Sequence, residues 1–148
     1  MSQIKHKLDI ICEQGNKLYD SSKYDDAIKT WLEGLAIINN DENFYNATIW
    51  FLASIGDAYF MKKDYKNAYI YFQKAIDILE KDEYENPFIT FRLGECLFET
   101  GDYKKSAIYL KRAYDTEGED IFMPDEQGED DGQKYLQFLK EFLNLNNI

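Results

Sequence analysis

The side chains that could do chemistry in this sequence are neighbouring carboxylates, two cysteines and one histidine. Asp25-Asp26 and Asp130-Asp131 are acidic pairs of the kind that can serve acid–base or metal chemistry. Both pairs fall in stretches that read as turns or loops, where carboxylates more often cap helices or stay hydrated. No residue is therefore predicted to be catalytic, and we expect a protein that is not an enzyme.

Metal and cofactor sites are not predicted either. The stretch DEQGEDDG at 125–132 suggests calcium, but it lacks the D-x-[DN]-x-[DN]-G order and the following glutamate of a calcium loop. Cys12, Cys96 and His6 show no CxxC, HxxxH or similar spacing, which argues against zinc. We therefore expect no metal and no cofactor.

Targeting signals are not found in the sequence. The beginning, MSQIKHKLDI, has no apolar run after its positive charges, so it does not resemble a signal peptide. No stretch approaches the roughly 18 consecutive apolar residues that indicate a membrane-spanning helix. We expect a cytoplasmic protein in which both thiols are reduced.

The formal net charge is -11, and the acidity is concentrated toward the C-terminus. Residues 1–114 carry 15 basic and 18 acidic side chains, whereas residues 115–148 carry 2 and 10. Phosphate would be repelled, so neither nucleic acid nor an anionic membrane is expected as a partner. The charge favours a basic protein as partner; the alternative is that the acidity only maintains solubility.

Helix-length apolar patterns recur three times, in residues 9–38, 50–80 and 88–117. Each segment holds two such patterns around a short polar turn, and five anchor positions recur with identical spacing. The anchors are Gly15, Gly56 and Gly94; Tyr24, Tyr65 and Tyr103; Ala27, Ala68 and Ser106; Trp31, Phe72 and Leu110; Gly34, Ala75 and Ala113. The small residues are expected to let paired helices approach closely while the large ones fill the space beside them.

This pattern resembles the tetratricopeptide repeat, a helix–turn–helix unit of about 34 residues. The resemblance implies an all-α fold in which three helix pairs form a right-handed superhelical stack, as a single domain over residues 1–148. In this register the repeats span 8–41, 49–82 and 87–120, and insertions occupy 42–48 and 83–86.

Local signals predict where helices begin and end. Asp64 and Asp102 are expected N-caps, Pro87 suits the first turn of a helix, and Gly101 suits a turn. The insertion ENFYNAT at 42–48 has no glycine or proline, so we expect it to extend the following helix backward by about two turns.

The C-terminal region departs from the repeat. Residues 117–132 read as an acidic loop, in which Ile121, Phe122 and Met123 could pin the chain back onto the last repeat. Residues 133–145 then show the apolar spacing of an amphipathic helix, which is expected to cap the stack.

A partner-binding groove is predicted from helical geometry. At about 100° per residue, positions 2, 5, 9, 12 and 13 of each repeat lie opposite the buried side and line the concave face of such a stack. Aromatics and carboxylates dominate this set, which marks a binding surface unless the C-terminal helix folds into the groove and buries it. The set is Asp9, Cys12, Asn16, Tyr19 and Asp20; Trp50, Ala53, Asp57, Phe60 and Met61; and Phe88, Phe91, Glu95, Phe98 and Glu99.

Some tetratricopeptide-repeat proteins grip the acidic C-terminus of heat-shock chaperones with a clamp of Lys, Asn and Arg. The corresponding positions here are Cys12, Asn16, Asp57, Phe88 and Arg92, so only Asn16 and Arg92 match. Because the groove is acidic, it would repel a carboxylate tail, and we do not expect chaperone-tail binding.

Longer stretches are similar to a narrower group of small bacterial proteins. The stretches that carry this likeness are Ala47, Thr48 and Trp50, then GDAYF (56–60), NPF (86–88), RLGEC (92–96), RAY (112–114), EGEDIF (117–122) and KYLQFLK (134–140). Such proteins are often encoded beside polymorphic contact-dependent toxins and resemble immunity proteins.

The resemblance implies a non-catalytic interaction module that binds and occludes a basic toxin domain. The alternative is a general scaffold or adaptor that binds a short peptide segment of a partner protein. A homodimer formed through the exposed aromatic side chains is a third possibility that the sequence leaves open.

Overall fold

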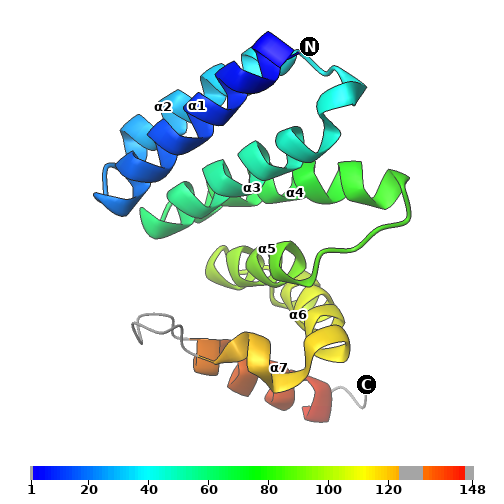
Figure 1. Cartoon of the computed structure of the whole chain (residues 1–148). Coiled ribbons are helices and arrows are strands. Elements are labelled where there is room, and N and C mark those ends of the chain that lie inside the picture. Colours follow the sequence, from blue (N-terminus) through cyan, green and yellow to red (C-terminus); the bar gives the residue numbers. More distant parts are fainter. Residues whose placement is uncertain (1, 124–131, 146–148) are drawn as a thin grey trace. The chain divides into compact units, whose positions relative to one another are not determined.

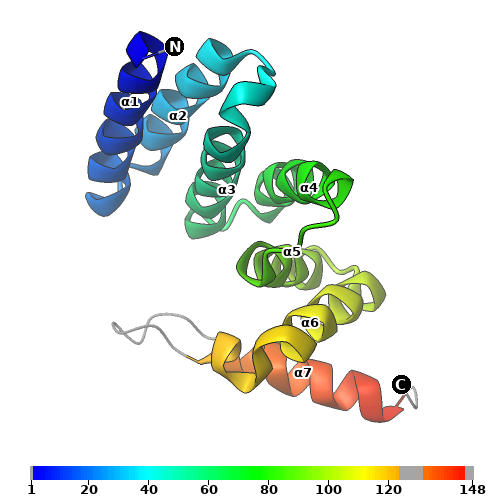
Figure 2. The same cartoon turned by 45° about the vertical axis from the view of Figure 1, so that its right-hand side comes forward.

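The computed structural model describes residues 2–123 and 132–145, and within these ranges every regular element is helical, which confirms the all-α fold class. Figure 1 and Figure 2 show the helices as successive antiparallel pairs. The elements are α1 (Ser2–Asp20), α2 (Tyr24–Ile38), η1 (Glu42–Phe44), α3 (Tyr45–Met61), α4 (Tyr65–Lys81), α5 (Pro87–Glu99), α6 (Tyr103–Glu117), η2 (Gly118–Phe122) and α7 (Gly132–Leu145).

The chain forms two compact units, Met1–Ile78 and Leu79–Ile148, here called the first and the second unit. The boundary lies near the end of α4, close to the start of the predicted insertion at 83–86. The first unit therefore holds the first two helix pairs, and the second unit holds the third pair with η2 and α7.

In the first unit, α2 packs against both α1 and α3. Trp31 of α2 and Phe51 and Ile55 of α3 are fully buried at the centre of this packing. Helix α4 pairs with α3 through Tyr59 and Tyr71, whose rings are stacked with centroids 5.7 Å apart. Large apolar side chains thus hold successive helices together, as the repeat pattern predicts.

The glycine anchors lie where paired helices approach most closely. A Cβ atom at Gly56 would come within 2.8 Å of the Phe72 ring, and one at Gly94 would come within 2.8 Å of Leu110. At Gly15 a Cβ would overlap the indole ring of Trp31. The prediction that these glycines set the distance between helices is therefore confirmed in all three helix pairs.

The predicted helix starts are also confirmed. The side chain of Asp64 accepts a hydrogen bond from the backbone N–H of Asn67, and that of Asp102 accepts one from Lys105, each at 3.3 Å. Pro87 is the first residue of α5, and Gly101 has a φ of 90° in the turn that follows α5. These local signals work because each satisfies a backbone group or a dihedral angle within a few residues.

The expected extension of a helix through the insertion at 42–48 is only partly right. Helix α3 begins at Tyr45 and is preceded by the 3-10 turn η1, so the α-helix gains about one turn rather than two. The reason is local: the Asp41 side chain accepts a hydrogen bond from the N–H of Asn43 at 2.9 Å and starts a separate 3-10 turn. Phe44, with φ -113° and ψ 33°, then separates this turn from α3.

In the second unit, α5 and α6 form a tight pair, and α7 packs on α6 and η2. Ser106 donates a hydrogen bond to the carbonyl of Gly94 at 2.7 Å inside the α5–α6 contact. Phe122 of η2 is fully buried, so part of the expected loop at 117–132 is an ordered 3-10 turn that packs on the core. The calcium-like stretch and the Asp130-Asp131 pair lie almost wholly in residues 124–131, outside the described part.

Candidate functional site

The groove residues that were predicted on α1 and α3 all keep some solvent exposure in the structure. Trp50, Met61 and the carboxylates of Asp9 and Asp20 are exposed, and so is Asn16. The remaining members are half-buried: Cys12, Tyr19, Ala53, Asp57 and Phe60. These ten residues, five on α1 and five on α3, form the candidate interaction face of the first unit, which we call the α1/α3 face.

Aromatic contacts link the two helices of this face. The ring of Trp31, from α2, lies with its centroid 6.1 Å from that of Tyr19 on α1 and 5.7 Å from that of Trp50 on α3. Trp50 also meets Phe51 edge-on at 5.4 Å. Trp50 nevertheless remains 37 % exposed, so its ring is held on one side by the core and presents the other side to solvent.

Negative charge accompanies these rings. Asp9 and Asp20 are the first and the last of the five predicted positions on α1, and both carboxylates are exposed. None of the predicted positions on α1 and α3 is a lysine or an arginine. Burial, and to a smaller extent the carboxylate of Asp9, raises the pKa of the Cys12 thiol. The predicted positions on α1 and α3 therefore combine apolar side chains with carboxylates.

The groove prediction fails for two residues of the third helix pair. Phe91 is only 4 % exposed and packs edge-on against Phe122 with ring centroids 4.9 Å apart, so it is a core residue. Glu95 is fully buried, and its carboxylate is paired with Arg92 at 2.9 Å. The prediction assumed that the concave surface of the third helix pair is open to solvent. At Phe91 it is not, because Phe122 of η2 and Tyr135 of α7 pack against that ring.

Helix α7 covers the neighbouring part of α5 as well. Its Tyr135 donates a hydrogen bond to Glu99 at 2.8 Å, and Lys134 pairs with the same carboxylate at 2.6 Å. Phe98 packs against Tyr135 and Phe138, at centroid distances of 5.3 Å and 4.9 Å. The alternative that the C-terminal helix buries predicted groove residues is thus correct within the second unit. Of the five predicted groove residues on α5, Phe88 alone stays widely exposed.

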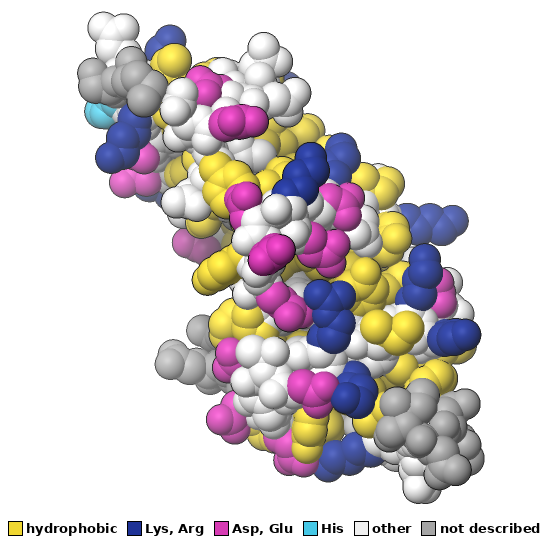
Figure 3. Space-filling view, turned by 90° about the vertical axis from the view of Figure 1, so that its right-hand side faces the viewer, with side chains coloured by type: hydrophobic (Ala, Val, Ile, Leu, Met, Phe, Trp, Pro, Cys, Tyr) yellow, Lys and Arg dark blue, Asp and Glu magenta, His cyan; other side chains and the backbone are white. Residues whose placement is uncertain are grey.

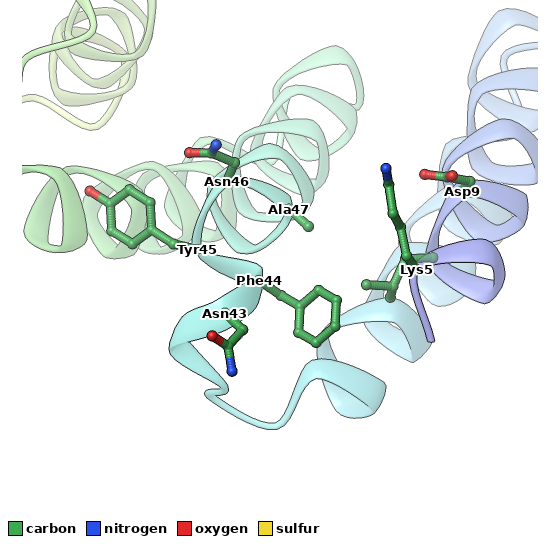
Figure 4. A pocket seen from close by; sticks show the side chains of 8 residues that line it. Lys5, Asp9, Asn43, Phe44, Tyr45, Asn46 and Ala47 are labelled. Atoms are coloured by element: carbon green, nitrogen blue, oxygen red, sulfur yellow. The ribbon is translucent and has the colours of Figure 1, made fainter. Parts of the chain in front are cut away.

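A cavity of about 450 Å³ adjoins the α1/α3 face and was not predicted. Figure 4 shows the Phe44 ring and Ala47, on the insertion side, turned toward Lys5 on α1. Asp9, a member of the α1/α3 face, also lines the cavity, so the cavity adjoins that face. Sequence reasoning missed Lys5 and Phe44 because both lie outside the repeat register, although an aromatic residue within an insertion was a usable signal.

Charge on the molecular surface is mixed. Figure 3 shows acidic and basic side chains interspersed with apolar ones on the side that it presents. The acidic pair Asp25-Asp26 lies in the first turn of α2, and Asp25 forms an ion pair with Lys62. Among residues 2–123 and 132–145, no three His, Cys, Asp or Glu side chains are placed to hold a metal ion. No helix in the described part is long and apolar enough to cross a membrane.

Structural comparison identifies similar folds. The TPR domain of Arabidopsis FLU superposes with a TM-score of 0.70 at 13 % identity, covering 76 % of this chain and 96 % of that domain. The C-terminal TPR-containing domain of a Plasmodium falciparum FK506-binding protein gives 0.74 at 18 % identity, over 97 % and 95 % of the two chains. The TPR2AB domain of yeast Sti1, in a complex with pHSP90, gives 0.65 at 20 % identity; 94 % of this chain covers 48 % of that one.

Sequence comparison agrees with the fold. No curated protein matches the sequence. Two models of the tetratricopeptide repeat match it, one over residues 51–82 and the other over residues 73–121. These matches confirm that the chain carries tetratricopeptide repeats.

Proposed function

We propose that this protein is a non-catalytic interaction module, and specifically an immunity protein that binds a basic toxin domain and occludes it. The observation that carries the proposal is the α1/α3 face, where the partly exposed Trp50 of α3 packs on Trp31 and where α1 carries the exposed carboxylates of Asp9 and Asp20. Aromatic anchors surrounded by charges of one sign are typical of surfaces that bind a protein of opposite charge.

The proposed binding has two physical components. The net charge of -11 steers a basic protein toward the complex and raises the association rate. Trp50, Tyr19 and Phe60 then bury apolar surface and slow dissociation. Asn16 and Asp57 add hydrogen-bonding groups on the same two helices. Inhibition follows from steric occlusion of the partner's active site or of its substrate path, with no chemical step on this protein.

The experiment that tests this proposal begins with capture of the partner from cells that naturally make the protein. The expected partner is one basic protein bound in a 1:1 ratio. Expressed alone, this partner should arrest growth, and co-expression of the wild-type protein should restore growth. The variant Asp9→Lys/Asp20→Lys should fail to protect and should bind the purified partner at least about 10-fold more weakly, because like charges now face each other.

A matched control separates the face from the overall charge. Asp26→Lys/Glu33→Lys makes the same change in net charge at two exposed positions of α2 and should leave protection intact. The immunity proposal is wrong if the captured partner is harmless when expressed alone. The assignment to the α1/α3 face is wrong if both double variants lose binding equally.

A second candidate function is a general adaptor that binds an extended peptide. The structural likeness to the TPR2AB domain of Sti1 in its complex with pHSP90 favours this alternative. The two candidates differ in affinity, since an adaptor of this kind is expected to bind a short segment with a Kd on the order of micromolar. If a synthetic peptide from the captured partner binds as tightly as the folded partner does, the adaptor function is the correct one.

A further inference from the structure

Two of the most exposed large apolar side chains in the described residues lie on one short segment. Tyr84 is 64 % exposed and Phe88 is 63 % exposed, whereas the other large apolar side chains reach at most 51 %. Both belong to the second unit, in the stretch that leads from the end of α4 into α5. Among the described residues, neither ring is seen in an aromatic pair, and most of each side chain's surface is exposed to solvent.

The backbone that carries these rings is held in place. The N–H of Tyr84 donates to the carbonyl of Leu79 at 3.0 Å, across a turn in which Glu83 has a φ of 55°. The Asn86 side chain caps α5 by accepting a hydrogen bond from the N–H of Phe88 at 3.0 Å. Rings on an ordered backbone lose little conformational entropy on binding, which favours their use as anchors.

The same segment is strongly acidic. Residues 80–88 contain the carboxylates of Glu80, Asp82, Glu83 and Glu85 against a single lysine, and all four carboxylates are solvent-exposed. We call Tyr84, Phe88 and these four carboxylates the 80–88 surface.

Two carboxylates of this surface, those of Glu80 and Glu85, already bind a guanidinium group of the protein itself. Arg112 of α6 donates from Nε to Glu85 at 3.1 Å, and its Nη2 lies 3.7 Å from Glu80. Its guanidinium carbon also lies 5.1 Å from the centroid of the Tyr109 ring. Carboxylates together with an aromatic ring are therefore the environment in which this molecule holds an arginine side chain.

We propose that the 80–88 surface is a docking site for an arginine-bearing, basic segment of a partner protein. Arginine side chains of the segment would lie on the Tyr84 and Phe88 rings and pair with Asp82 and Glu83. Arginine is favoured over lysine because a planar guanidinium can stack on a ring and bind a carboxylate through two hydrogen bonds at once. This site shares no residue with the α1/α3 face and does not depend on the proposed immunity function.

The test titrates the isotope-labelled full chain with acetyl-Gly-Arg-Gly-Arg-Gly-amide, followed by NMR, at low and at physiological salt. Shifts are expected at residues 80–88 and at Arg112. The lysine counterpart of the peptide should bind more weakly. The variant Tyr84→Ala/Phe88→Ala keeps the net charge and should bind the arginine peptide about 5- to 30-fold more weakly, as expected for the loss of two exposed cation–π contacts.

Matched controls keep the outcome interpretable. Ile70→Ala/Ile108→Ala removes two other exposed apolar side chains and should bind as the wild type does, and Tyr84→Phe should bind within about threefold because it keeps the ring. Far-UV circular dichroism verifies that each variant is folded; if the double alanine variant is not, Tyr84→Ala alone replaces it. The proposal is overturned if the double alanine variant binds like the wild type, if both peptides bind equally, or if the shifts spread over all acidic surfaces.

Discussion

The indole rings of Trp31 and Trp50 meet edge-on, with centroids 5.7 Å apart and an interplanar angle of 89°. Trp31 is buried in the core of the first unit, whereas Trp50 is partly exposed. The same buried ring also lies beside Tyr19 of its own repeat. One core residue thus positions two surface rings from different helices, and this arrangement makes Trp50 a fixed anchor rather than a mobile side chain.

Trp50→Ala is expected to weaken partner binding by at least about 10-fold, because it removes the largest exposed ring of the α1/α3 face. It should also lower the free energy of unfolding by about 1–2 kcal/mol through lost contacts with Trp31 and Phe51. Trp50→Phe should recover most of that stability. Calorimetric titration with the captured partner and urea denaturation measure the two effects; unchanged affinity in the folded alanine variant would exclude Trp50 from the interface.

Gly56→Ala is expected to lower the free energy of unfolding by about 1–3 kcal/mol. Its Cβ would come within 2.8 Å of the Phe72 ring, which is fully buried and has little room to move. The higher helix propensity of alanine offsets only about 1 kcal/mol of this cost. Thermal and urea denaturation measure the change, with Asn46→Ala at an exposed position of α3 as the control. A more stable Gly56→Ala protein would show that glycine does not set this helix spacing.

Tyr135→Phe is expected to lower the free energy of unfolding by about 1–2 kcal/mol. The variant removes the hydrogen bond to Glu99 while preserving the ring contacts with Phe91 and Phe98. Tyr84→Phe, at a widely exposed hydroxyl, is the control and should change the free energy by no more than about 0.5 kcal/mol. If the two variants have equal stability, the hydrogen bond contributes nothing to holding α7 on α5.

Cys12 is expected to react slowly with a thiol reagent in the folded protein. Its pKa is raised, first by burial and then by Asp9, so at pH 8 the folded state holds less thiolate than the unfolded chain. The corresponding contribution to stability is present below the ordinary thiol pKa and is lost as the pH rises through the folded value.

The rate of reaction with an aromatic disulfide reagent, followed from pH 7 to 10, measures this shift. Asp9→Asn should speed the reaction of Cys12 modestly because it removes the smaller of the two causes. Cys96 is fully buried and should react only on unfolding, which makes the Cys96→Ala variant a clean background for the measurement. A Cys12 rate equal to that of a short cysteine peptide at every pH contradicts the prediction.

The repeat anchors and helix caps could be predicted because their causes are local. Gly56 and Phe72 are 16 residues apart on two helices joined by a short turn, so a periodic pattern is enough to pair them. Asp64, Asp102 and Pro87 act within three residues of their own positions. The exposed positions on α1 and α3 followed from the same periodicity, since the helix face opposite the core packs less completely than the core face does.

The burial of predicted groove residues in the third helix pair could not be predicted in this way. The repeat register treats Phe91 and Glu95 as groove residues, but Phe91 packs against Phe122 and Tyr135, which are far away in the sequence and outside the repeat. Which apolar face α7 covers depends on packing between non-periodic segments, and no spacing along the chain specifies it.

The sequence by itself therefore determined the helices, their pairing and the strongly acidic charge, because these depend on residue type and on short-range spacing. Only the tertiary structure decided which aromatic side chains remain accessible. Phe91 and Phe98 pack against side chains of η2 and α7, whereas Trp50, Tyr84 and Phe88 stay exposed to solvent. The physical reason is that burial is a property of the whole packed chain, since apolar surface is removed from water by whichever segment reaches it.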